Sequence, residues 1–305
     1  MKLLSVETNG CRGVADRRYM LSSAGAPHPI VAVTGAEGSG KTSLLDAIAF
    51  GKEVVAPYGS PPAAAEIVRP GLDECKIVIE WWLDPDEAAY AANDGATTEA
   101  IVRRHGLPDT DADVGLASVL ERYGHDPAIG KIDYFPDDRR IPAHGHGAFD
   151  LELDQKMRRL TRGPDKYAAL SRFARDALRG EAGPERGAAL QELFHQLSPR
   201  ARLAGLSALG APVFHGPGGS ETPLERLSTS ARMAFLFAAT FAMVGLHQSV
   251  VLIDTPELGL GPDDAARLLR VLRAFAPSTQ LVVATRDRGV LELAGPQATV
   301  HLEAA

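Results

Sequence analysis

The sequence of 305 residues predicts an α/β fold built on a mostly parallel core sheet. Two observations lead to this prediction. A strand, a glycine-rich loop and an amphipathic helix follow one another over residues 30–50, and a strand–helix–strand unit covers residues 250–285. Strands that are joined by a helix over such a length pair in parallel within one sheet.

The composition is that of a globular protein without a disulfide framework. Hydrophobic residues make up 45% of the chain and charged residues 23%, which excludes a disordered or collagen-like protein. The two cysteines, Cys11 and Cys75, are too few for a disulfide scaffold and are not spaced as metal ligands. The formal net charge of −7 argues against nucleic-acid binding through overall charge.

The N-terminal segment and the apolar runs predict a cytoplasmic protein with no membrane partner. Residues 1–13 become polar soon after Lys2, so they lack the apolar stretch of a signal peptide. The longest apolar run, residues 233–246, is shorter than the roughly 20 residues that span a bilayer. We therefore expect a buried helix there.

In the first half of the chain, the apolar patterns predict four strands and one strong helix. The strands are expected over residues 2–8, 30–34, 77–83 and 131–135. The helix covers residues 41–50, where Leu44, Leu45 and Ile48 share one face. Residues 85–123 are expected to form a loosely helical insert with many small residues.

In the second half, a helical insert comes first and strands return after it. Residues 151–209 follow a helical pattern, and residues 151–202 carry 11 Lys and Arg against 7 Asp and Glu. Strands are expected over residues 213–215, 250–254 and 281–285, and an acidic first turn after Gly261 predicts a helix between the last two. The predicted domains are an N-terminal lobe (1–150), a helical insert (151–210) and a C-terminal lobe (211–305).

The most specific motif is a phosphate-binding loop over residues 35–42, where GAEGSGKT matches G-x-x-x-x-G-K-[ST] in full. The glycines let successive backbone N–H groups point at phosphate oxygens, and the following helix presents its positive end to the same anion. Lys41 is expected to reach the β- and γ-phosphates, and Thr42 to ligate Mg²⁺. The predicted nucleotide-binding residues of this loop are Gly35, Glu37, Gly38, Ser39, Gly40, Lys41, Thr42 and Ser43.

A second metal ligand is predicted at Asp254. This residue ends the apolar run VVLI, which is the position of a Walker B carboxylate. Such a carboxylate holds Mg²⁺ together with the hydroxyl of the phosphate loop. The sequence therefore predicts ATP and Mg²⁺ as cofactors, with Thr42 and Asp254 at the metal.

These motifs, in this order, resemble the RecF/SMC/OLD-like branch of ABC-type ATPases. Lys41 and Asp254 lie 213 residues apart with a helical insert between them, which is the layout of that class. Further similar segments are VRPGLDECKI (68–77), YFPDDR (134–139), LSTSAR (227–232), VVLIDTPELGLGP (250–262) and LVVATRD (281–287). The resemblance implies a P-loop NTPase head of ABC type, without a long coiled coil and with an antiparallel strand layer beside the core sheet. It also implies that Ser228 and Ser230, at the signature position, contact ATP held by a second subunit.

Residues at the hydrolytic positions depart from the family pattern. The glutamate after the Walker B aspartate is replaced by Thr255, the switch histidine by Arg286, the signature glycine by Ser230, and the His or Asp before the helix-starting proline by Gly261. Glu257 is either a substitute base or a structural acid at the dimer surface. Arg286 either stabilises charge on the γ-phosphate or is a solvated side chain. The predicted catalytic residues are Asp254, Glu257 and Arg286.

Three functions are compatible with these features. The first is an ATP-operated homodimeric switch, a slow ATPase that acts on DNA or a separate effector protein, which the resemblance associates with genome maintenance or anti-phage defence. DNA would contact a basic side of the insert formed by Arg158, Arg159, Arg162, Arg172, Arg175 and Arg179. The second is a non-hydrolysing ATP sensor or scaffold, which the altered catalytic positions favour. The third is a transporter ATPase subunit, disfavoured because no clear Gln-bearing coupling loop is present.

Overall fold

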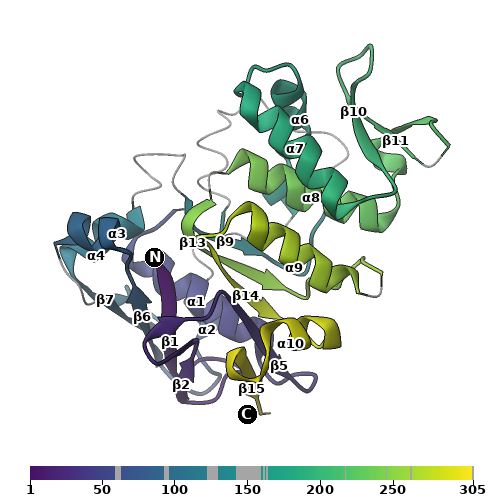
Figure 1. Cartoon of the computed structure of the whole chain (residues 1–305). Coiled ribbons are helices and arrows are strands. Elements are labelled where there is room, and N and C mark those ends of the chain that lie inside the picture. Colours follow the sequence, from purple (N-terminus) through teal and green to yellow (C-terminus); the bar gives the residue numbers. More distant parts are fainter. Residues whose placement is uncertain are drawn as a thin grey trace.

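Figure 1 shows the computed structural model of the chain. It describes residues 1–58, 63–92, 96–121, 130–141, 159–160, 162, 164–216, 218–244, 246–261 and 263–303. Within this part of the chain, no helix is long and apolar enough to cross a membrane.

A five-stranded parallel sheet forms the centre of the fold, as the sequence predicts. Its strand order is β15 (Thr299–Leu302), β5 (Ile30–Gly35), β14 (Gln280–Ala284), β13 (Leu246–Asp254) and β9 (Gly130–Phe135). Each neighbouring pair in this order is parallel. The carboxyl ends of β5 and β13 therefore lie at the same edge of the sheet, which brings the phosphate loop next to Asp254.

Both faces of this sheet are buried, which explains why its strands are continuous apolar runs. Val33 and Leu252 belong to the core on the side of α1 (Lys41–Val55). Val251 and Val283 face the opposite core, which contains residues of α8 (Thr229–Met243), α9 (Asp264–Phe275) and α10 (Arg288–Ala294). The buried helix predicted over residues 233–246 corresponds to α8.

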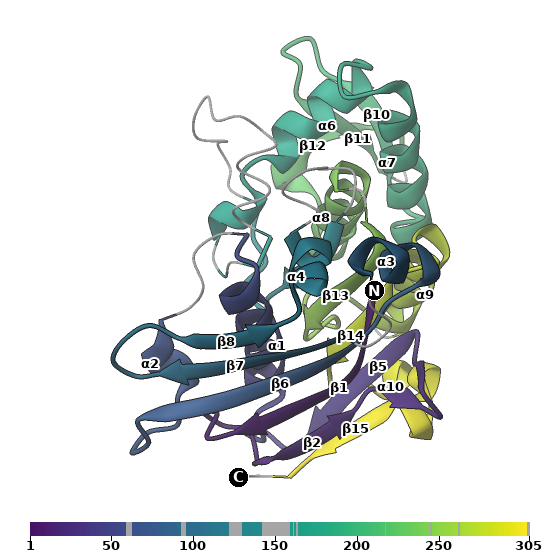
Figure 2. The same cartoon turned by 90° about the vertical axis from the view of Figure 1, so that its left-hand side faces the viewer.

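An antiparallel sheet covers the other side of α1, so this helix lies between two sheets (Figure 2). Its strand order is β2 (Arg17–Met20), β1 (Lys2–Asn9), β6 (Glu74–Trp82), β7 (Ala96–Arg103) and β8 (Asp109–Ala112). This sheet is the expected antiparallel layer. The smaller elements of this lobe are α2 (Ala64–Ile67) and the β3–β4 ribbon, Ser22–Ser23 and Ala26–Pro27.

The expectation of a loosely helical insert over residues 85–123 was wrong. Two short helices, α3 (Pro85–Ala91) and α4 (Val114–Glu121), flank the strands β7 and β8. The side chains of β7 alternate strictly between buried and more exposed positions, and β7 pairs with β6 over eight residue pairs. The strand therefore forms because β6 offers a free edge above α1, although its small residues give a weak strand signal.

A separate lobe of helices and a small sheet lies at the top of Figure 1. It contains α6 (Leu170–Leu178), α7 (Pro184–Leu197) and the antiparallel strands β10 (Arg202–Leu206), β11 (Pro212–His215) and β12 (Glu221–Pro223). Phe214 packs edge-on against Phe194 at 5.2 Å and Phe235 at 5.4 Å between ring centroids, which joins β11 to α7 and α8. The predicted domain boundary at residue 150 lies outside the described residues, and the three-domain division stays a prediction.

The basic side predicted for the insert is smaller in the structure. Arg159 is fully buried, with its Nε 3.3 Å from Asp133 Oδ2, so it does not reach solvent. Arg162 pairs with Asp46 of α1 at 3.0 Å. The exposed arginines that remain from the predicted set are Arg172, Arg175 and Arg179, which pair with Asp176 or Glu181. Arg158 lies outside the described residues.

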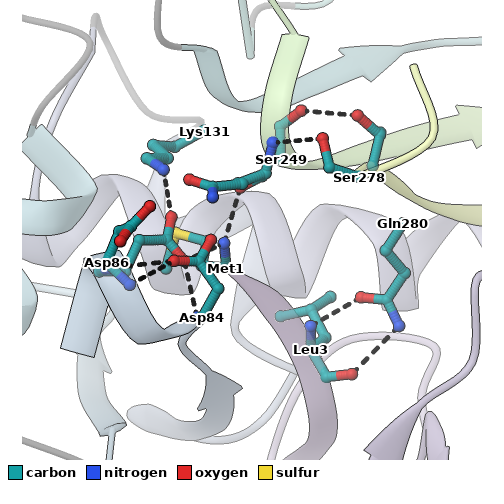
Figure 3. A network of polar contacts seen from close by, with 11 residues as sticks. Met1, Leu3, Asp84, Asp86, Lys131, Ser249, Ser278 and Gln280 are labelled. Carbon is teal, nitrogen blue, oxygen red and sulfur yellow. Dashed lines mark hydrogen bonds and ion pairs between the residues drawn. The ribbon is translucent and has the colours of Figure 1, made fainter. Parts of the chain in front are cut away.

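A buried polar network connects the N-terminal end of β1, in the antiparallel sheet, to α3 and to the parallel sheet (Figure 3). Glu87 of α3 pairs with the ammonium of Met1 and with Lys131 of β9, and all three are inaccessible to solvent. The side chain of Gln280 accepts a hydrogen bond from the Leu3 N–H at 2.6 Å and donates to the Leu3 carbonyl at 3.1 Å. Burial lowers the pKa of the Met1 ammonium to about 5, despite the nearby carboxylate.

Candidate nucleotide-binding site

The phosphate loop joins β5 to α1 and is packed closely against neighbouring backbone. Gly40 has a φ of +88°, and a Cβ there would lie 1.6 Å from the Gly13 carbonyl oxygen. A Cβ on Gly35 would lie 2.4 Å from the carbonyl oxygen of Leu302. The loop therefore follows this path only because both positions lack a side chain, as the motif predicts.

Lys41 begins α1 and bends back over the loop. Its Nζ donates to the Gly35 carbonyl at 3.0 Å and to the Ala36 carbonyl at 2.7 Å. Partial burial lowers the pKa of Lys41, and the positive charge of Arg286 lowers it further. The negative charges of Asp254 and Glu257 raise the pKa of the same ammonium. Charged side chains from the end of β13 and from the segments that follow β13 and β14 therefore act on Lys41 at the loop.

The structure brings Thr42 and Asp254 together. The Thr42 hydroxyl donates to Asp254 Oδ2 at 2.7 Å, and the hydroxyl of Thr255 donates to Oδ1 of the same carboxylate at 3.0 Å. Asp254 is buried at the end of β13. Hydroxyl and carboxylate oxygens are the ligand types that Mg²⁺ prefers.

Glu257, three residues after β13, is hydrogen-bonded to the two residues that follow β14. Its Oε2 accepts from the Thr285 hydroxyl at 2.8 Å, and its Oε1 accepts from the Arg286 N–H at 3.3 Å. Both carboxylate oxygens therefore have a partner within the chain. Because these bonds connect the segment after β13 to the switch position, they favour the structural alternative for Glu257.

Arg286 extends toward the phosphate loop and remains largely in solvent. Its Nη1 lies 4.0 Å from Oε2 of Glu37, and the two side chains are 60% and 91% exposed. An exposed pair of this kind adds little stability. Arg286 is therefore available to an anion at the loop, although Glu37 competes for it.

Ser228 and Ser230 lie at the start of α8, where Ser228 is the residue that precedes the helix. The Ser228 hydroxyl accepts from the Ala231 N–H at 3.3 Å, which is an N-cap, and lies 3.3 Å from the Ser230 hydroxyl. Within the described part of the chain, neither serine is bonded to the phosphate loop. A groove of about 800 Å³ beside them is also lined by Arg200, Arg226 and Arg267.

Two residues at the site were not predicted from the sequence. Arg139 donates to the carbonyl oxygens of Asp254 at 2.6 Å and Thr255 at 2.7 Å. Asp46 of α1 accepts from the Tyr134 hydroxyl at 3.1 Å and from Arg162, and burial raises its pKa to about 6. Arg139 ends the YFPDDR segment, so the family resemblance contained a signal for it. Asp46 had no such signal.

Comparison with known families identifies the domain. A model described as "AAA domain, putative AbiEii toxin, Type IV TA system" matches residues 30–292. The chain belongs to this family of AAA domains. It is therefore a P-loop ATPase domain, and its phosphate loop is an ATP-binding loop. No curated protein matches the chain.

Solved structures of SMC heads share the fold over nearly the whole chain. An SMC head bound to the C-terminal winged-helix domain of ScpA matches with a TM-score of 0.60 and 15% identity, covering 100% of this chain and 98% of that one. The SMC head domain from Thermotoga maritima matches with a TM-score of 0.53 and 15% identity, covering 96% and 92%. These matches confirm the predicted ABC-type head fold. The longest helices among the described residues, α1 and α8, have 15 residues each, so this part contains no long coiled coil.

Proposed function

We propose that the chain is an ATP-operated switch that binds ATP with Mg²⁺ and dimerises when both are bound. One observation supports this more than any other. The hydroxyl of Thr42 and the carboxylate of Asp254 meet at 2.7 Å, although they are 212 residues apart in the chain. The two groups that would hold the metal are therefore already together beside Lys41.

The residues present fit both ATP and Mg²⁺. The hydroxyl of Ser39 is buried in the loop and has no hydrogen-bond partner among the described residues, as expected of a group that awaits a ligand. Thr42 and Asp254 supply the oxygens for Mg²⁺, whose charge would help to neutralise the phosphates. Lys41 would exchange its bonds to the loop carbonyls for phosphate oxygens.

Dimerisation would complete the site. Ser228 is exposed at the N-terminus of α8 and, among the described residues, is not bonded to the loop of its own chain. Its hydroxyl caps the helix by accepting from the Ala231 N–H, and its proton is what it would offer to a nucleotide on a second copy. Arg200, Arg226 and Arg267 line the groove beside it together with Asp264, which pairs with Arg267 at 2.8 Å, so the arginines leave the groove with a net positive charge. ATP bound between two such surfaces would add contacts that exist only in the closed dimer, and would therefore shift the population toward it.

Turnover in this switch is expected to be slow. Thr255 occupies the position of the base and has a hydroxyl that cannot take a proton at neutral pH, and both oxygens of Glu257 are engaged. A positioned base contributes about 10² to 10⁴ in rate, which this site would lack. The same observations favour the second candidate function, a non-hydrolysing ATP sensor or scaffold in the cytoplasm.

A separate effector protein is the partner that we favour. The related SMC head is described as bound to a domain of ScpA, so this fold accepts protein partners. DNA is a further candidate through Arg172, Arg175 and Arg179, but their ion pairs with nearby acids reduce the available charge. The family description mentions a toxin–antitoxin system, which agrees with a role in anti-phage defence.

The test combines particle mass and ATP turnover. The mass of the chain at micromolar concentration is measured without nucleotide, with ADP and with ATP, each with Mg²⁺, and phosphate release is followed on the same samples. The switch predicts a dimer with ATP and slow phosphate release, and a sensor predicts the dimer without release. A monomeric mass under all three conditions would contradict both.

A further inference from the structure

Thr255 has an unusual backbone conformation at the edge of the ATP site. Its φ is +50°, in the left-handed region. The other described non-glycine residues with positive φ are Ala24, Ala92, Gln248 and Asp263, so Thr255 is the β-branched member of this group. A branched Cβ makes this region unfavourable, and such strain persists only where the surroundings hold the residue in place.

Three groups of Thr255 are held by hydrogen bonds. Its N–H donates to the Ala284 carbonyl at 2.8 Å, and its hydroxyl donates to Asp254 Oδ1 at 3.0 Å. Its carbonyl accepts from Arg139 Nη2 at 2.7 Å and from the Leu258 N–H at 3.0 Å. The first bond comes from the neighbouring strand β14 and the second from the adjacent residue. Of the two bonds to the carbonyl, one comes from Leu258 in the following turn and the other from Arg139, which lies 116 positions earlier in the chain.

Arg139 holds the two peptide groups that flank Thr255, through the carbonyls of Asp254 and Thr255. Its Nη1 donates to the Asp254 carbonyl at 2.6 Å and to the Pro136 carbonyl at 2.9 Å. The side chain is 5% exposed, and its guanidinium lies 5.6 Å from the centroid of the Phe237 ring in α8. A planar guanidinium can span two carbonyls with fixed geometry, whereas the ammonium of lysine cannot.

We propose that Arg139 is a positioning residue for the metal-binding end of β13. By fixing the carbonyls of Asp254 and Thr255, it keeps Thr255 in the left-handed conformation. The Thr255 hydroxyl then stays on Oδ1 of Asp254, and Oδ2 stays turned toward Thr42. The inference rests on the proposed function, because it assumes that Asp254 helps to hold Mg²⁺ with ATP.

This role makes a selective prediction about nucleotide affinity. Affinity that needs Mg²⁺ depends on the orientation of Asp254, and therefore on Arg139. Affinity that remains without metal comes from Lys41 and the loop, which Arg139 does not touch. A residue that only stabilised the fold would change both parts together.

The experiment measures the dissociation constant for ATP with Mg²⁺ and with EDTA, for the parent, Arg139→Lys and Arg139→Met. We expect the gain in affinity from Mg²⁺ to fall at least tenfold in both variants, while the affinity in EDTA changes less than threefold. Arg140→Met is the matched control, because Arg140 is 78% exposed and pairs with Asp138. It should retain the full gain.

The outcomes separate this inference from the proposed function. A parent that binds no ATP overturns the proposed function. A parent that gains affinity from Mg²⁺, with the same gain in Arg139→Lys and Arg139→Met, overturns the role of Arg139 alone. If the Arg139 variants lose the same factor of ATP affinity with Mg²⁺ and with EDTA, the role of Arg139 is also overturned, since equal losses indicate damage to the fold.

A second variant, Thr255→Asn, tests the strain directly, and its own melting temperature is measured without any change at Arg139. Asparagine adopts the left-handed conformation more readily than threonine. Thr255→Asn should therefore raise the melting temperature of the nucleotide-free chain. Arg139→Lys should then lower the melting temperature less in the Thr255→Asn background than in the parent. A lower melting temperature for Thr255→Asn, with an unchanged effect of Arg139→Lys, would overturn the proposal.

Discussion

Two glycines of the phosphate loop form a matched pair for testing its geometry. Gly40 and Gly38 both have left-handed backbones, with φ of +88° and +74°. A Cβ at Gly40 would lie 1.6 Å from the carbonyl oxygen and 2.7 Å from the carbonyl carbon of Gly13, whereas a Cβ at Gly38 would have no atom within 4 Å. Because the contacts at Gly40 are with backbone, no flexible side chain can move aside.

The expected costs follow from this difference. Gly38→Ala adds only the strain of a left-handed alanine, about 1 kcal/mol of unfolding free energy. Gly40→Ala adds the same strain and forces the loop away from Gly13, so we expect at least about 3 kcal/mol in total. ATP affinity should fall at least tenfold in Gly40→Ala, since the displaced loop no longer directs its N–H groups at the phosphates.

Urea unfolding of the parent and the two variants gives the first quantity, and calorimetric titration with ATP and Mg²⁺ gives the second. The parent's unfolding slope must be retained for the comparison to hold. Equal losses of stability in the two variants would refute the packing of Gly40 against Gly13. A Gly40→Ala chain that is strongly destabilised but binds ATP normally would refute the link between this packing and the site.

Three further predictions follow from the site. Burial raises the pKa of Asp46 from 3.8 to about 6, so the folded chain binds this proton more tightly than the unfolded chain and loses stability as the pH rises from 4 through 6. Asp46→Asn should therefore gain up to about 3 kcal/mol relative to the parent between pH 4 and pH 7, measured by urea unfolding, and a constant difference would contradict this. Glu257→Gln should lose hydrolysis and retain the ATP-bound dimer if Glu257 is the base, whereas a structural Glu257 leaves the slow parental rate of phosphate release unchanged or nearly so. Rapid parental hydrolysis that survives the substitution would contradict both. Ser228→Arg should prevent the ATP-dependent increase in mass, because it places bulk and charge against the facing nucleotide, and a normal dimer would contradict the assembly.

The fold and the site could be predicted best where the relevant residues are close together in the sequence. The phosphate loop, its flanking strand and helix, and Asp254 at a strand end could all be predicted, because each depends on neighbours within about ten residues. The parallel pairing of β13 with β14 followed from the strand–helix–strand spacing, and the structure adds β5 on the other side of β14. The convergence of Thr42 and Asp254 was then a consequence of this order.

Features that depend on distant partners could not be predicted. Arg159 looked like part of a basic surface, but Asp133 of β9 pairs with it in the interior. The strand β7 has few large apolar residues and is defined by its pairing with β6. The roles of Glu257 and Arg139 likewise became visible only through the bonds that each makes to another element.

Titration of ATP with Mg²⁺ into the parent and Lys41→Ala is the most direct test of the central claim. Lys41 is the cation that begins α1, and its ammonium lies on the loop carbonyls of Gly35 and Ala36, where the β- and γ-phosphates are expected. The account predicts that the affinity of Lys41→Ala is at least tenfold lower, which is about 1.4 kcal/mol. Equal affinities in the two proteins would contradict the assignment of this loop as the ATP site.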